Sequence, residues 1–247
     1  MMKKILFLLY GIVSYAAFLG TTLYTMGFVG NLVVPKTIDG EPKTSQSAAV
    51  LINASLLLLF ALQHSIMART VFKRRLIRII PKELERSSFV LISSLCLALL
   101  MWQWQPVGGI VWSVENKGAT DLLHILYLVG WGIVLISTFL INHFDLFGLR
   151  QVWLYFKGKP YTELSFELPG LYQLARNPMY IGFMIAFWST PLMTATHLLF
   201  AVLTTGYILA AMSFEKRRQF TAFGEKYKAY KKWAPILIPF TKKRTNK

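Results

Sequence analysis

Seven polar or ionisable residues stand beside long apolar segments, where their side chains could do chemistry at the face of a membrane. They are His64, Asn142, His143, Asp145, Arg176, Asn177 and Glu215. A polar group at membrane depth is costly, so it is treated first as a functional candidate. The seven come from distant parts of the sequence but are expected near one membrane face. They therefore predict a pocket for a polar, soluble cofactor beside an apolar compartment.

The same residues have plainer interpretations, which stay open. A His or Asn at a helix end is often a cap or an interfacial anchor. His64 and His143 could also bind haem or a metal, but the chain has no His-x-x-x-His pair, phosphate loop, dinucleotide fingerprint or serine elbow. Cys96 is the only cysteine, which excludes a cysteine-based zinc site and a disulfide within the chain. No metal is expected.

Five apolar regions must position these residues. Crossing a bilayer takes about 20 apolar residues. The first four regions meet this length, and they cover residues 5–34, 48–68, 87–104 and 122–141. The fifth, 178–214, is interrupted by Pro191 and predicts a helical hairpin with a short arm at 178–190. The predicted fold is all-α: a polytopic membrane helix bundle of four spanning helices plus a C-terminal hairpin.

Composition supports a membrane protein and argues against a soluble one. Hydrophobic residues make up 55% of the 247 residues, and charged residues make up 15%, against about 25% in soluble domains. A net charge of +16 would suggest nucleic acid in a soluble protein. Here the positive charge flanks apolar runs, so the expected partner is the lipid bilayer with its anionic headgroups, and not nucleic acid. The oligomeric state is left open.

Positive charge predicts the orientation. Lysines precede the first helix, and the loop at 69–86, the segment 143–176 and the tail after Glu215 are basic. The segment 35–46 is balanced, and the loop after the third helix is nearly uncharged. Both termini are therefore expected in the cytoplasm, with the protein in a bacterial inner membrane. The chain is expected to form a single membrane domain: four spanning helices within 1–142, a cytoplasmic loop at 143–177, the hairpin, and a basic tail at 215–247. Trp102, Trp104 and Trp112 predict an aromatic belt at the outer side.

The C-terminal third carries a recognisable pattern. Residues 174–182 read Leu-Ala-Arg-Asn-Pro-Met-Tyr-Ile-Gly, and the hairpin is followed by Glu215, Phe223-Gly224, Tyr227 and Tyr230. This resembles the isoprenylcysteine carboxyl methyltransferase-like superfamily of membrane S-adenosylmethionine enzymes, whose pattern is Arg-His-Pro-x-Tyr-x-Gly, a Glu-Glu pair, then Phe-Gly-x-x-Tyr-x-x-Tyr. Two positions depart from it: Asn177 replaces the usual His, and Lys216 replaces the second Glu. Asparagine can still form hydrogen bonds but is not a base near neutral pH.

Other segments point to one branch of that superfamily. Residues 62–69 read Leu-Gln-His-Ser-Ile-Met-Ala-Arg, and 142–151 read Asn-His-Phe-Asp-Leu-Phe-Gly-Leu-Arg-Gln. With the hairpin residues 186–199, they resemble the methanethiol S-methyltransferase family over about 51–239. A neighbouring branch, the NnrU type linked to nitrite and nitric oxide reduction, shares the region around His64 and is the alternative. A lipid or prenylcysteine methyltransferase, or a membrane scaffold without a cofactor, also stays open.

The resemblance implies methyl transfer from S-adenosyl-L-methionine to a small thiol, methanethiol, giving dimethyl sulfide. It assigns six residues to the cofactor: Arg176, Asn177, Pro178, Tyr180, Gly182 and Glu215. Arg176 and Tyr180 would hold the methionine carboxylate, and Glu215 would meet the amino group. The thiol must lose its proton, because the thiolate is the nucleophile. His64, His143 and Asp145 are the candidate proton acceptors, in no fixed order.

Overall fold

The structure, a computed structural model, describes residues 1–162, 164 and 169–237, and it describes only the backbone between 214 and 223. The chain forms two compact units. Unit 1 comprises Met1–Val111, His143–Glu163 and Met193–Leu199. Unit 2 comprises Trp112–Asn142, Leu164–Leu192 and Phe200–Lys247.

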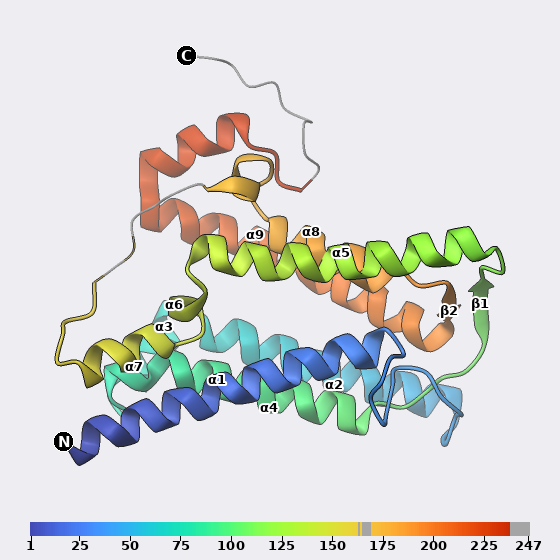
Figure 1. Cartoon of the computed structure of the whole chain (residues 1–247), viewed down its shortest axis with the longest axis horizontal. Helices are drawn as coiled ribbons and strands as arrows, with labels where there is room; N and C mark the ends of the chain where they lie inside the picture. The colour runs from blue at the N-terminus through green and yellow to red at the C-terminus, as the bar shows by residue number, and fades with distance from the viewer. Residues whose placement is uncertain (163, 165–168, 238–247) are drawn as a thin grey trace. The chain divides into compact units, whose positions relative to one another are not determined.

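Unit 1 is built on three long helices. In Figure 1, α4 (Glu85–Gln103) packs against both α1 (Met2–Val29) and α2 (Gln46–Met67). The Ser45 hydroxyl accepts a hydrogen bond from the Ala48 amide and caps the start of α2. Short helices complete the unit: α3 (Thr70–Leu76), the 3₁₀ helix η1 (Lys82–Leu84), α6 (His143–Leu146) and α7 (Leu149–Phe156).

Unit 2 is built on α5 (Lys117–Ile141), α8 (Pro178–Trp188) and most of α9 (Ala195–Trp233). The Asn116 side chain caps the start of α5 by accepting from the Ala119 amide at 3.0 Å, and Asn142 ends this helix with a left-handed φ of +95°. Pro178 stands at the first position of α8, where a missing amide hydrogen costs nothing. A 3₁₀ helix, η2 (Gly170–Gln173), precedes α8, and the short strands β1 (Ile110–Ser113) and β2 (Leu192–Thr194) pair as a two-stranded sheet.

The predicted fold class is confirmed. Among the described residues, five helical segments are long and apolar enough to cross a membrane: Met2–Val29, Gln46–Met67, Lys82–Gln103, Lys117–Ile141 and Ala195–Ser213. The short arm of the hairpin, α8, has 11 residues and is too short to be counted with them. The chain is an integral membrane protein, because only helices that satisfy their own backbone hydrogen bonds tolerate such long apolar exposure to lipid.

Some local predictions differ from the structure. The first helix ends at Val29 and not at residue 34, because Asn31 and Val33 take left-handed φ values of +53° and +48°. Trp102 is 70% exposed, as an aromatic belt requires, but Trp104 is fully buried and packs edge-on against Phe28. Trp104 is therefore a core residue and not an interfacial anchor.

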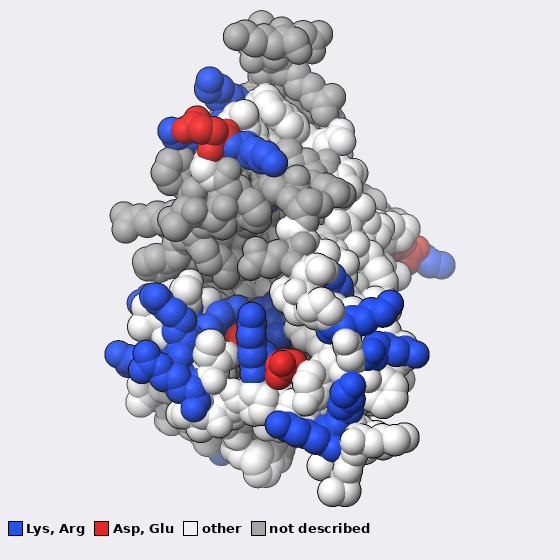
Figure 2. Space-filling view, turned by 90° about the vertical axis from the view of Figure 1, so that its left-hand side faces the viewer, with Lys and Arg blue, Asp and Glu red and all other residues white. Residues whose placement is uncertain are grey.

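Positive charge gathers at one end of unit 1. Figure 2 shows lysines and arginines over the face that carries the N-terminus, α3 and α7, with few acids among them. The segment at the other end of α1, residues 35–46, has two lysines and two acids. Here the Asp39 carboxylate accepts hydrogen bonds from Asn31 and from the Thr194 hydroxyl. Asn53, which is fully buried, exchanges two hydrogen bonds with the Gln105 backbone.

Two glycines let α5 and α8 approach closely within unit 2. A Cβ on Gly130 would lie 2.6 Å from the Ala186 backbone nitrogen, and one on Gly182 would lie 2.6 Å from the Gly130 carbonyl oxygen. Gly182 and Ala186 are four residues apart and form a small-xxx-small pattern of the kind that brings membrane helices together. Gly132 lies on the same helix as Gly130, but a Cβ there would meet nothing within 4 Å.

We expect Gly130→Ala to destabilise the protein and Gly132→Ala to leave it unchanged or slightly more stable. Both substitutions gain the same helix propensity, so their difference isolates the forced separation of α5 and α8. Overpacking of this kind costs about 1–3 kcal/mol. Thermal unfolding of both variants in one detergent measures the difference. Equal melting temperatures would show that the close approach does not stabilise the fold.

Candidate functional site

The predicted site residues fall into two groups, one in each unit. His64, His143 and Asp145 belong to unit 1, and we call them the histidine group. Unit 2 holds Arg176 and Asn177, which we call the arginine loop, together with Pro178, Tyr180, Gly182 and Glu215. In the histidine group, His64 on α2 and His143 on α6 come from segments that are far apart in the sequence.

His143 is buried in an aromatic setting at the start of α6. Its ring meets those of Tyr15, Phe18 and Phe147 edge-on, with centroids 4.8–6.3 Å apart, and only 5% of the residue is exposed. Its Nε2 lies 2.8 Å from the Tyr15 hydroxyl oxygen. Burial lowers the pKa of His143 below its usual value, which is about 6.5. The imidazole is therefore neutral at neutral pH, which is the form that accepts a proton.

His64 contacts the same apolar cluster from α2. Its ring centroid lies 4.9 Å from that of Phe89 and 5.5 Å from that of Phe60. Phe89 packs with Met67 and Val90, and Phe18 and Phe147 pack against this cluster. The Nδ1 atom of His64 is buried and has no hydrogen-bond partner among the described residues. The structure thus brings both histidines to one aromatic cluster within unit 1.

Asp145 is engaged in a different way. Its carboxylate pairs with Arg150 at 2.8 Å and accepts a hydrogen bond from the Tyr161 hydroxyl at 3.3 Å. Arg150 also donates to the Thr162 carbonyl and hydroxyl, at 2.9 and 2.7 Å. This network ties the segment after α7 back to α6. Asp145 therefore has a structural role in unit 1, and its part in proton transfer stays a prediction.

Arg176 is the buried cation of the arginine loop. Only 8% of the residue is exposed. One terminal nitrogen donates to the Tyr227 hydroxyl at 3.3 Å, and the backbone amide donates to the Pro235 carbonyl at 2.9 Å. The buried Nε has no hydrogen-bond acceptor within the described part of the chain. Because leaving a buried charged donor unpaired is costly, this guanidinium suits a bound anion such as a carboxylate.

The last turns of α9 and the residues after it hold the arginine loop and the preceding η2 in place. Asn177 donates from its side-chain amide to the Ile236 carbonyl at 3.2 Å. The Tyr230 hydroxyl donates to the Tyr172 carbonyl at 2.6 Å, and burial raises the pKa of this tyrosine. Asn177, which replaces the histidine of the superfamily pattern, thus performs a hydrogen-bonding role that needs no titration.

The remaining predicted residues lie on α8 and α9. Pro178 is buried at the first position of α8, and the Tyr180 amide donates to the Asn177 carbonyl. Gly182 packs against Gly130, which explains the need for glycine; its contact with a cofactor stays a prediction. Glu215 lies within α9, but its side chain, like that of Lys216, is outside the part of the structure that is described.

Tyr15, the hydrogen-bond partner of the candidate His143, was not among the predicted site residues. It contacts His143 although 128 positions separate the two residues, so nothing local to His143 reveals it. The sequence could have revealed Tyr15, because its hydroxyl lies within a spanning segment, and a polar group at membrane depth was the criterion that selected His64. Among the described residues, no group of three or more His, Cys, Asp or Glu side chains is placed to hold a metal ion.

Comparison with known proteins finds relatives that match nearly the whole chain. The chain is 50% identical over 238 residues to a methanethiol S-methyltransferase of Crocosphaera subtropica, covering 96% of this chain and 93% of the relative. It is 47% identical over 244 residues to a methanethiol S-methyltransferase of Mycobacterium tuberculosis, covering 99% and 100%. It is also 29% identical over 189 residues to nurim of Xenopus laevis, covering 69% and 66%.

No family model and no solved structure matches the chain. The assignment therefore rests on the relatives, which cover nearly the whole chain. With about half of all positions identical over nearly the whole length of both proteins, the chain belongs to the methanethiol S-methyltransferase family.

Proposed function

We propose that the protein transfers a methyl group from S-adenosyl-L-methionine to methanethiol, giving dimethyl sulfide. The C–S bond between the methyl group and the sulfonium breaks as a C–S bond to the thiol sulfur forms. The products are dimethyl sulfide, S-adenosylhomocysteine and one proton. The observation that carries this proposal is the identity to methanethiol S-methyltransferases over nearly the full chain.

We assign binding of the methyl donor to unit 2. Bound S-adenosylmethionine supplies an activated methyl group on a good neutral leaving group, so no general acid is needed. Arg176 holds the donor's carboxylate, because its buried Nε lacks an acceptor among the described residues and guanidinium binds carboxylate well. Tyr180 assists Arg176, and Glu215 meets the donor's amino group. Asn177, Pro178 and Gly182 shape the start of α8 around these contacts.

Within unit 1, the histidine group offers the candidate proton acceptors. A free thiol ionises at a pKa of about 8.5 or higher, and the thiolate is the effective nucleophile. His143 fits this role best, because burial keeps it neutral and Tyr15 fixes the direction of its ring. Asp145 already pairs with Arg150, and His64 is the second candidate. The rest of catalysis is the in-line placement of two reactants away from water.

We also propose that the basic end of unit 1 and both termini face the cytoplasm in a bacterial inner membrane. Positive charge concentrated on one side of the spanning helices is the usual mark of that side, and Figure 2 shows such a concentration around the N-terminus. The cytoplasm is also the side on which a charged, soluble methyl donor is made, whereas methanethiol can enter from the bilayer.

Purified protein given methyl-labelled S-adenosylmethionine and methanethiol should release labelled dimethyl sulfide into the headspace. Gas chromatography with mass detection measures the product. Reactions without protein or without donor are the controls. Label that appears in extracted lipids and not in the gas would identify a lipid methyltransferase and overturn the proposed acceptor.

Arg176→Lys should weaken donor binding about tenfold or more. The lysine keeps the charge but loses the planar fork of donors, and a hydrogen bond to a charged group contributes about 1.5–3 kcal/mol. Isothermal calorimetry with S-adenosylmethionine measures the affinity. Arg78→Lys, the same change at an exposed position, is the matched control.

Glu215→Ala should abolish donor binding while the melting temperature stays unchanged. Wild-type affinity in this variant would remove Glu215 from the site. If Arg176→Lys and Arg78→Lys bind S-adenosylmethionine with equal affinity, Arg176 is not part of the donor site. Neither result depends on which thiol is methylated.

His143→Gln should slow turnover about 10²–10⁴-fold at pH 7, the usual contribution of a general base, and recover at pH 10. At high pH methanethiol ionises without help, so the missing acceptor matters less. In the wild type, burial lowers the pKa of His143, so the base stays neutral to a lower pH than an ordinary histidine would. Rates measured from pH 5 to 10 test this. His64→Gln is the parallel variant, and a loss that is the same at every pH would argue against proton transfer by the residue changed.

A further inference from the structure

The last part of α9 is an amphipathic segment whose lysines have no part in the proposed methyl-transfer site. Gly224, with φ +51° and ψ −121°, breaks the helix beyond its apolar span, which ends at Ser213. In the following segment, Tyr227 and Tyr230 are buried and pack with Trp233 and Ala234. The four lysines of the segment are exposed: Lys226, Lys228, Lys231 and Lys232.

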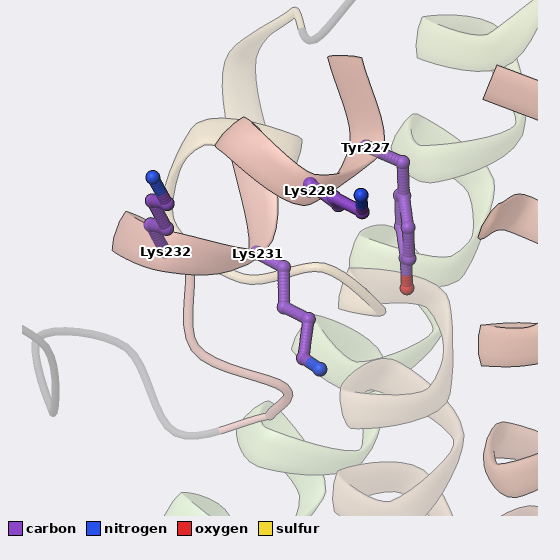
Figure 3. A pocket seen from close by; sticks show the side chains of 4 residues that line it. All are labelled: Tyr227, Lys228, Lys231 and Lys232. Atoms are coloured by element: carbon purple, nitrogen blue, oxygen red, sulfur yellow. The ribbon is translucent and has the colours of Figure 1, made fainter. Parts of the chain in front are cut away.

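Three of these lysines line a hollow. Tyr227, Lys228, Lys231 and Lys232 surround a space of about 480 Å³. Figure 3 shows the amino groups of Lys228 and Lys231 on the side of the helix where Tyr227 lies, whereas Lys232 points away from them. This volume is within the range of about 300–1,000 Å³ typical of small-molecule sites. The hollow is thus large enough for a polar headgroup.

The lysine side chains that line the hollow favour a ligand that carries a phosphate. The segment carries four lysines and one acid, Glu225, which pairs with Lys228. Lysine binds phosphate as a point charge, and its aliphatic stem, like the ring of Tyr227, tolerates apolar neighbours. The Tyr227 hydroxyl also accepts a hydrogen bond from Arg176. This bond fixes the position of the aromatic side chain that lines the hollow.

The position of the hollow favours a lipid as the source of that phosphate. Clusters of lysine and arginine next to a spanning helix bind anionic headgroups, each contributing about fivefold in affinity near the surface. We propose that the hollow binds the headgroup phosphate of an anionic phospholipid, at a specific site distinct from the general attraction of the basic end of unit 1 to the membrane.

The test uses the full chain in detergent, with native mass spectrometry counting bound phosphatidylglycerol. Lys228→Gln, Lys231→Gln and Lys232→Gln are combined in one variant. The matched control combines Arg74→Gln, Arg75→Gln and Arg78→Gln, which removes the same charge from exposed positions of unit 1. We expect the lysine variant to bind at least tenfold less lipid than the wild type, and the control to bind as the wild type does.

Equal losses in the two triple variants would show attraction to charge alone and overturn the site. Undiminished binding in the lysine variant would also overturn it. Displacement of the lipid by millimolar inorganic phosphate would show that free phosphate, and not a headgroup, is the ligand. If the lysine variant fails to fold, two other variants take its place. Replacing Lys228, Lys231 and Lys232 by arginine should retain lipid binding, and Lys231→Gln alone should weaken it; the opposite results would overturn the site. The readout is binding, so the outcome is independent of which thiol is methylated.

Discussion

The hydrocarbon core of a bilayer allows no unpaired backbone polar group, and this constraint decides where the protein can do chemistry. Five helical segments satisfy it by bonding internally along their whole length. Irregular backbone appears where helices end, for example at Asn31 and Val33 after α1 and at Asn142 after α5. The candidate functional residues follow the same rule, because most of them lie where a spanning helix gives way to a loop.

The two groups of site residues differ in chemical character, and the difference fits the proposed reaction. The arginine loop offers a buried cation whose Nε has no acceptor among the described residues, which suits a ligand carrying a carboxylate. The histidine group offers a buried, neutral imidazole held by a tyrosine hydroxyl, which suits the loss of one proton. Methyl transfer from a sulfonium demands little more than these two functions and good alignment.

Much of the fold was predictable because apolar length reports directly on membrane crossing. The errors came where length carries no information. Gly30 and Asn31 are residue types that commonly end a helix, but the apolar length criterion ignores them, so the end of α1 was placed five residues too late. Trp104 resembles an interfacial anchor in sequence, but it packs against Phe28. Tyr15 was overlooked because its partner, His143, is 128 positions away.

By itself, the sequence determined that the chain is helical and membrane-embedded. The spacing from Arg176 to Tyr230 indicated the superfamily, and residues 62–69, 142–151 and 186–199 indicated the family, because hydropathy and motif spacing are properties of the linear chain. Only the tertiary structure decided which candidate side chains contact other residues of the protein and which have an atom left to bind a ligand. It paired Asp145 with Arg150, gave Gly182 a packing role against Gly130, and buried Arg176 beside Tyr227. These outcomes depend on contacts between residues far apart in sequence, and such contacts form only when the helices pack.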